Sequence, residues 1–142
     1  MEVSHVRRRL SAAIDRARKG SQERRERVAA AERAYDTFLA DVAVPVTRML
    51  ASALKADGYP FTVNTPGGSV RLASDKGRDD YIEFALSADS NPPEVLGIIR
   101  YARGSRTVSE ERAVKPGAPP QDITEDDVLE FLLKAIEPWL ER

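Results

Sequence analysis

Cysteine is absent from this 142-residue chain, and histidine occurs only once, as His5. The missing thiols exclude disulfides, thiolate zinc sites and a cysteine nucleophile. We expect His5 to lie on the surface near the start of the chain. Because it is the single histidine, a histidine-dependent triad and a two-histidine metal site within one chain are excluded. Any catalysis would depend on carboxylates, lysine, tyrosine, serine or threonine. No motif indicates a cofactor, and we favour a non-enzymatic protein.

Long apolar runs are missing as well. No apolar run approaches the ~18 residues that can span a membrane, and the N-terminal stretch lacks the apolar core of a signal peptide. We therefore expect a cytoplasmic protein without a membrane span. Its 42% hydrophobic and 32% charged residues are typical of a globular chain. The length is that of one ordinary domain with its own core.

Acidic residues are scarce at the N-terminal end of the chain. Residues 1–27 hold nine basic and four acidic side chains, whereas residues 28–142 hold thirteen basic and nineteen acidic ones. The formal net charge of −1 hides this asymmetry. A basic end and an acidic remainder indicate either a polyanionic partner for the basic end or association between the two regions.

The first third of the chain has a helical pattern, with apolar residues three or four apart from Val3 to Leu54. Gly20 and Pro45 are potential interruptions. An unbroken helix over residues 2–42 would be about 60 Å long, whereas the remaining residues should form a body with a radius of gyration of ~13 Å. Either the helix breaks at Gly20 and folds back as a hairpin, or it projects and requires a partner.

Residues 60–114 change to an alternating pattern that predicts a four- to five-stranded antiparallel meander. In the first connection, Pro66 and Gly67 suit the central positions of a type II turn. The last segment, residues 106–114, is polar and is predicted to be an edge strand.

A proline-rich linker, residues 115–123, precedes a closing helix over residues 124–141. Thr124 suits its N-cap. We predict that one apolar stripe of this helix is buried: Val128, Leu129, Leu132, Leu133, Ile136 and Leu140. The expected fold is α+β, with an N-terminal region over residues 1–42 and a body over residues 43–142. The body begins with a short helix over residues 46–57, and its closing helix packs on one face of the sheet.

Three carboxylates, Asp79, Asp80 and Glu83, form a candidate metal site because a loop pair followed by a strand acid can place several oxygens near one point. Such a site would support a metal-dependent phosphoesterase-like enzyme. The opposing interpretation is an ordinary loop that also contains Lys76 and Arg78.

Arginines also gather around the Gly104–Ser105 turn. Arg100, Arg103 and Arg106 could bind an anion there, whereas pairing with acids on a neighbouring strand is the alternative interpretation.

The N-terminal helix carries the two main hypotheses about function. We predict that Val3, Val6, Leu10 and Ile14 contact a partner, either a second copy in a homo-oligomer or another protein. A heptad pattern over residues 3–42 is apolar at its ends and polar in the middle, which predicts a weak coiled coil.

The alternative is nucleic-acid binding by the basic side chains of that helix. These candidate anion-binding residues are Arg7, Arg8, Arg9, Arg16, Arg18 and Lys19. Interspersed acids and the lack of aromatic residues among them count against this alternative.

Overall fold

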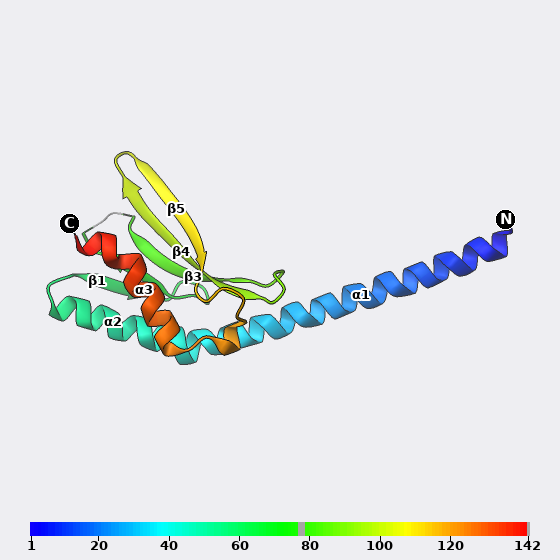
Figure 1. Cartoon of the computed structure of the whole chain (residues 1–142), viewed down its shortest axis with the longest axis horizontal. Coiled ribbons are helices and arrows are strands. Elements are labelled where there is room, and N and C mark those ends of the chain that lie inside the picture. The colour runs from blue at the N-terminus through cyan, green and yellow to red at the C-terminus, as the bar shows by residue number, and fades with distance from the viewer. Residues whose placement is uncertain (77–78, 142) are drawn as a thin grey trace.

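The computed structural model describes residues 1–76 and 79–141. It shows a long helical segment, then a five-stranded sheet, then a closing helix, which confirms the predicted α+β class (Figure 1). The helical elements are α1 (Val3–Phe38), the π-helical turn η1 (Leu39–Ala43), α2 (Val44–Ala56), the 3-10 turn η2 (Pro120–Asp122) and α3 (Glu125–Leu140). The strands are β1 (Phe61–Asn64), β2 (Arg71–Ser74), β3 (Tyr81–Ser87), β4 (Glu94–Arg103) and β5 (Arg106–Ala113).

The first helix does not break at Gly20, so the hairpin alternative is not the one that the protein adopts. A helical glycine costs about 1 kcal/mol relative to alanine, which neighbouring arginine, glutamate and alanine residues can tolerate. The irregularity near Pro45 is the turn η1, directly ahead of α2. A proline ring collides with the carbonyl four residues earlier in a regular helix, and the wider π-helical turn relieves that collision.

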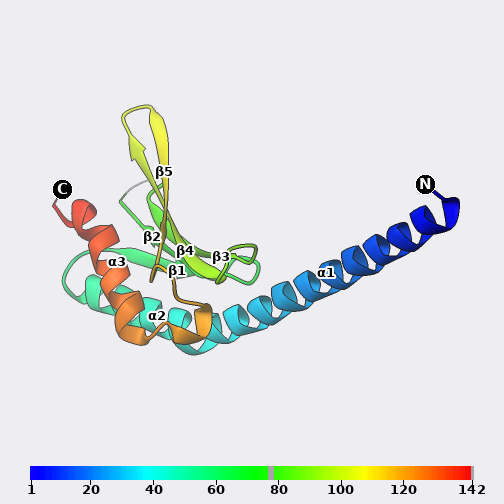
Figure 2. The same ribbon diagram turned by 45° about the vertical axis from the view of Figure 1, so that its right-hand side comes forward.

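The sheet is an antiparallel meander in the order β1-β2-β3-β4-β5, so β5 is an edge strand as predicted. Its longest pairings join β3 to β4 and β4 to β5. The β4–β5 hairpin extends beyond the helices, as Figure 2 shows. Charged side chains along β5 discourage a further strand from pairing with this edge.

One face of the sheet is covered by the end of α1, by η1, by α2 and by α3. Alternate strand residues such as Ile82 and Phe84 are buried there, whereas Tyr81 and Glu83 lie on the other face. Phe84 packs edge to face with Phe38 of α1, with ring centroids 6.2 Å apart. The core therefore fixes the root of α1 to the sheet.

The turn between β1 and β2 differs from the turn predicted from the sequence. Ser69 donates its amide hydrogen to the Pro66 carbonyl at 2.9 Å, which places Gly67 and Gly68 in the central positions. Both glycines have positive φ values, 35° and 79°. Since a turn with two left-handed central residues requires glycine-like residues at both, the prediction of Pro66 and Gly67 was wrong.

The buried stripe of α3 is narrower than predicted. Val128, Leu132 and Ile136 are fully buried, but Leu129 and Leu133 are 36% and 46% exposed. Ala135 and Trp139 take their place in the core. A helix against a flat sheet buries only the stripe that faces it, and each residue step rotates a side chain by about 100° away from that stripe.

Close approach of α3 to the sheet depends on Gly97 of β4. A Cβ atom at this position would collide with the Phe131 ring of α3. Gly97 is buried, and Phe131 also contacts Phe84, with ring centroids 6.3 Å apart. The glycine is therefore a packing requirement rather than a turn residue.

Gly97→Ala should lower the free energy of unfolding by about 1–3 kcal/mol, because Phe131 must move to admit the methyl group. Gly20→Ala is the matched control, since a Cβ at Gly20 has nothing within 4 Å. The control should raise helix content and leave the unfolding of the body unchanged. Urea titration followed by circular dichroism measures both, and equal stability of the two variants would contradict this packing.

Asp127→Asn should destabilise the protein at neutral pH. Thr124 and Asp127 form a capping box at the start of α3, which confirms the predicted cap. The Thr124 amide donates a hydrogen bond to the Asp127 carboxylate, and the Lys115 ammonium lies 3.2 Å from Oδ2 of the same carboxylate. Both contacts, the hydrogen bond first, lower the pKa of Asp127 below its ordinary 3.8. The stabilisation is therefore present above pH ~4 and disappears as the pH falls through the lowered pKa.

Thermal melts from pH 7 to pH 2 check this expectation, with Glu125→Gln, another exposed acid of the first turn, as the control. The deficit of Asp127→Asn relative to the wild type should narrow at the acidic end. A deficit that is constant with pH would show that the carboxylate charge is irrelevant.

Candidate functional site

The most unusual surface of the molecule is the first part of α1, residues 3–27, which we call the arm. Almost every arm residue is exposed, and the first buried side chain of α1 is Ala31. In the described part of the chain, no hydrogen bond or ion pair joins the arm to the body. Figure 1 shows the arm projecting away from the body, so the helix does not fold back on its own chain.

Apolar side chains form a continuous stripe along the arm. Val3, Val6, Leu10 and Ile14 are 69%, 49%, 57% and 41% exposed. Spacings of three and four residues place them on one side of the helix. The arm therefore presents aliphatic surface to water without any covering element from its own chain.

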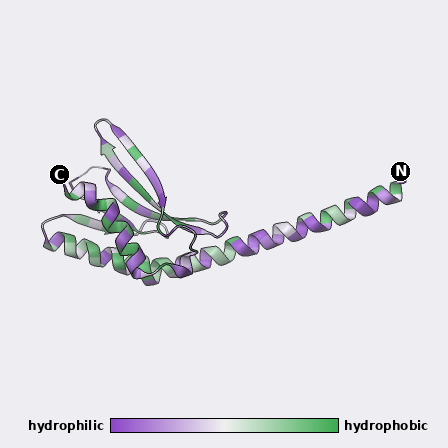
Figure 3. Cartoon of the chain, in the orientation of Figure 1, coloured by the Kyte–Doolittle hydropathy of each residue, from purple (hydrophilic) through white to green (hydrophobic). Residues whose placement is uncertain are grey.

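Basic side chains surround this stripe, and Figure 3 shows hydrophilic and hydrophobic residues alternating along the arm. By helical geometry, Arg7 and Arg18 flank the stripe on one side and Arg9 and Arg16 on the other. Arg8 and Lys19 lie on the opposite face. The structure thus brings the predicted partner-binding residues and the predicted anion-binding residues of the arm onto one amphipathic helix.

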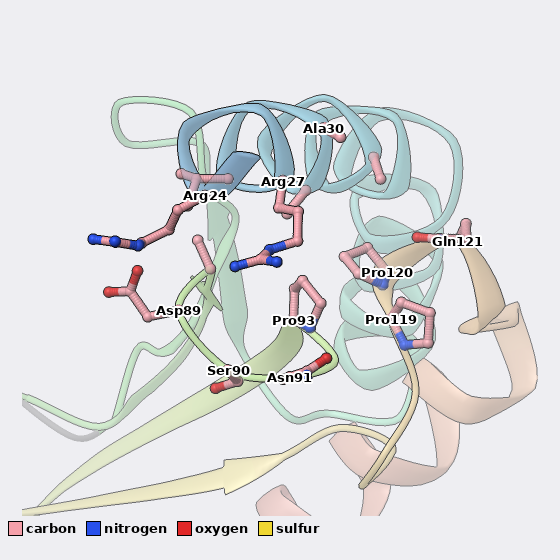
Figure 4. A pocket seen from close by; sticks show the side chains of 14 residues that line it. Arg24, Arg27, Ala30, Asp89, Ser90, Asn91, Pro93, Pro119, Pro120 and Gln121 are labelled. Atoms are coloured by element: carbon pink, nitrogen blue, oxygen red, sulfur yellow. The ribbon is translucent and has the colours of Figure 1, made fainter. Parts of the chain in front are cut away.

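A groove of about 550 Å³ lies where the arm meets the body. Its walls come from three segments: α1, the β3–β4 connection and the residues around η2 (Figure 4). Arg24 faces Asp89 across the opening, and Arg27 points into it above Pro93. Val28, Ala31 and Pro120 supply apolar lining. Sequence reasoning missed this groove because its residues are distant in the chain and match no motif.

The root of the arm is held by apolar packing beside this groove. Tyr35 stacks on Phe38 with ring centroids 6.1 Å apart. Burial raises the pKa of Tyr35 to about 12, and its hydroxyl has no hydrogen-bond partner in the described structure. The nearby Ser69 hydroxyl donates to the Phe84 carbonyl at 2.7 Å. A phenol at this position therefore contributes packing rather than acid–base chemistry.

The three predicted strand arginines do not all lie on one face of the sheet. Arg100 is on the uncovered face of the sheet, with its guanidinium 5.9 Å from the Tyr81 ring centroid. Arg103 and Arg106 are paired across the end of the β4–β5 hairpin. Since successive strand residues face opposite ways, Arg103 lies on the other side of the sheet from Arg100.

The three predicted carboxylates are also separated. Asp80 is buried and accepts a hydrogen bond from the Ala102 amide at 2.9 Å. Glu83 is on the uncovered face, where it pairs with Arg71 at 3.3 Å. Asp79 is exposed. Among residues 1–76 and 79–141, no group of three or more such side chains could hold a metal ion.

One 18-residue window within the continuous helix Val3–Ala56 is long and apolar enough, by length and composition alone, to cross a membrane. In this structure 44% of that window is buried. The buried residues of α2, among them Val46, Leu50 and Leu54, belong to the core beneath the sheet. This part of the helix is therefore apolar because it packs in the core of the fold.

No protein-family model, no curated protein and no solved structure matches the chain. Its function has to be inferred from its own surfaces. The fold supplies no cover for the apolar stripe of the arm in the described residues.

In dilute solution, backbone amides of residues 5–20 should exchange with deuterium faster than those of residues 35–38. The arm has no tertiary packing, and isolated helices are only marginally stable in water, whereas Tyr35 and Phe38 are in the core. Hydrogen exchange followed by mass spectrometry of peptide fragments measures both segments. Equal protection at the lowest usable concentration would contradict a projecting arm.

Proposed function

We propose that this protein is a non-enzymatic assembly module that associates with itself through its N-terminal arm. The observation that carries the proposal is the exposed stripe of Val3, Val6, Leu10 and Ile14 on a helix without tertiary support. Full burial of one such side chain contributes on the order of 1.5–3 kcal/mol. A contact that covers the stripe would also stabilise the arm as a helix.

A rigid body behind a projecting helix suits this role. The arm enters the core at Ala31 and Tyr35, so its direction is set by the fold rather than by a flexible linker. Attachment of the arm to the core limits the directions in which it can project, so binding loses less conformational entropy than binding through a freely jointed tail. The body in turn has its own core and does not depend on the arm for burial.

Leu10→Asp/Ile14→Asp should convert a multimer into a monomer. Two carboxylates in the stripe would have to be buried in the contact, which is strongly unfavourable. Light scattering gives the absolute mass, and circular dichroism should show that the body remains folded, because the core starts at Ala31. His5→Asp/Ala12→Asp adds the same number of carboxylates on the opposite face of the arm and should leave the multimer intact.

A wild-type chain that is monomeric at all accessible concentrations would contradict self-association. A variant beginning at Ala29 adds a second check, since it removes the whole arm and keeps the buried residues of α1. Like Leu10→Asp/Ile14→Asp, this shortened variant should be a monomer by light scattering.

Nucleic-acid binding is the second candidate, favoured by basic arm residues that form no ion pair within the described chain. It predicts binding of labelled DNA or RNA that weakens steeply with salt and depends little on base sequence. The acidic body would oppose this binding. Absence of binding at low ionic strength would eliminate the candidate.

A further inference from the structure

The arm cannot reach the body of its own chain. It is continuous with the buried end of α1, and the helix passes Gly20 without a break. Ile14 lies 17 residues before Ala31, the first buried residue, which corresponds to about 25 Å along the helix axis. Within residues 1–76 and 79–141, no part of the body can therefore cover the stripe of its own chain, whereas the body of a second copy can.

A second uncovered apolar stripe lies on α3. Leu129 and Leu133 are 36% and 46% exposed, and by helical geometry Leu140 continues the same line. Leu140 is half-buried against the core. The stripe from residue 129 to residue 140 and the arm stripe from residue 3 to residue 14 have the same length, about 16 Å.

Acidic side chains flank the α3 stripe. Residues 125–141 contain six acids and a single basic residue, Lys134. Asp126, Glu130 and Glu137 are exposed and lie on the solvent side of Leu129 and Leu133. Lys134 pairs with Glu130 at 3.2 Å and leaves the other two acids without a basic partner in the described chain.

The two stripes are complementary in charge. Residues 5–19 of the arm hold six basic side chains and one acid, against the six acids and one lysine of residues 125–141. Of those acids, Asp127 is already engaged by Thr124 and Lys115. Opposite charges around matching apolar stripes favour encounter and fix the alignment of two helices.

We propose that the arm of one copy docks on α3 of a second copy, with Val3, Val6, Leu10 and Ile14 covering Leu129 and Leu133. With the two helices antiparallel, Arg7 then lies beside Glu137 and Arg18 beside Asp126. This inference rests on the proposed self-association and names the surface that receives the arm. Because every copy carries both surfaces, the contact can be made twice and close into a two-fold dimer.

The competing arrangement, in which two arms pair with each other, is electrostatically unfavourable. It would bring two helices of the same positive charge side by side, and like charges across an interface are destabilising. Arm pairing along the full heptad pattern would also bury Ser21 and Arg24 in the middle of the seam. Docking on α3 avoids both costs and uses only the apolar end of the arm.

Leu129→Asp/Leu133→Asp in the full chain tests the docking surface directly. We expect a monomer by light scattering, although its arm is intact. Lys134→Asp is the matched control, because it makes the same change in net charge on another face of α3 and should leave the dimer intact. Circular dichroism and Trp139 fluorescence establish that α3 remains folded, since Trp139 stacks on Phe61 of β1 with ring centroids 6.3 Å apart.

Mixing distinguishes the two arrangements. Leu10→Asp/Ile14→Asp has a damaged arm and an intact α3, whereas Leu129→Asp/Leu133→Asp has the reverse. Each should be monomeric alone, and an equimolar mixture should form heterodimers through the one remaining contact. Native mass spectrometry separates heterodimers from homodimers when one partner is isotope-labelled.

A charge exchange keeps the test valid if the leucine variants unfold. Asp126→Lys/Glu137→Lys should weaken dimerisation at least about tenfold at low salt. Arg7→Glu/Arg18→Glu in the same chain should recover most of that loss, because the opposite charges face each other again.

The outcomes separate the two proposals. If the α3 variants keep the wild-type mass while the arm variants dissociate, the docking surface is wrong and self-association through the arm stands. If the wild-type chain is itself monomeric, both proposals fail. Dissociation by both sets of variants, with recovery on mixing or charge exchange, supports docking on α3.

Discussion

The continuity of one helix from solvent into the core constrains the rest of this structure. Helical hydrogen bonds are local, so the packing of Ala31, Tyr35 and Phe38 against the sheet sets the direction of every residue before them. No flexible joint allows the arm to fold back, because Gly20 is helical and the π-helical turn lies on the core side. Exposure of the apolar arm stripe is a direct consequence of this helical continuity.

The exposed leucines of α3 have a related origin. Gly97 permits Phe131 to approach the sheet closely, and Trp139 stacks on Phe61 at the other end of the helix. These two contacts set the rotation of α3 about its own axis. With that rotation fixed, Leu129 and Leu133 face away from the core although they belong to an apolar helix.

The arm and the exposed stripe of α3 are flanked by opposite charges. The net charge of −1 arises from a basic arm and an acidic remainder, and the acids of α3 account for much of that remainder. Segregated opposite charges in one chain favour contact between copies and disfavour contact between like surfaces. The same acidic body opposes the approach of a polyanion, which makes assembly the better-supported function.

Patterns local to the sequence predicted the elements well. Alternation over residues 60–114 predicted the meander, the polar last strand predicted an edge, and Thr124 predicted a helix cap. Each depends on interactions within a few residues or between adjacent strands. The first turn was assigned one residue too early, since the sequence Pro66-Gly67-Gly68 is compatible with two turn types.

Features that combine distant segments could not be predicted in the same way. The groove at the root of the arm joins three separate parts of the chain, and Asp80 and Glu83 are separated because a strand places them on opposite faces. The sequence alone determined the secondary structure, the meander and the amphipathic character of the arm, because periodicity and capping act over short distances. Only the tertiary structure decided that the arm projects and that Leu129 and Leu133 are exposed, because packing against the sheet sets the direction and rotation of each helix.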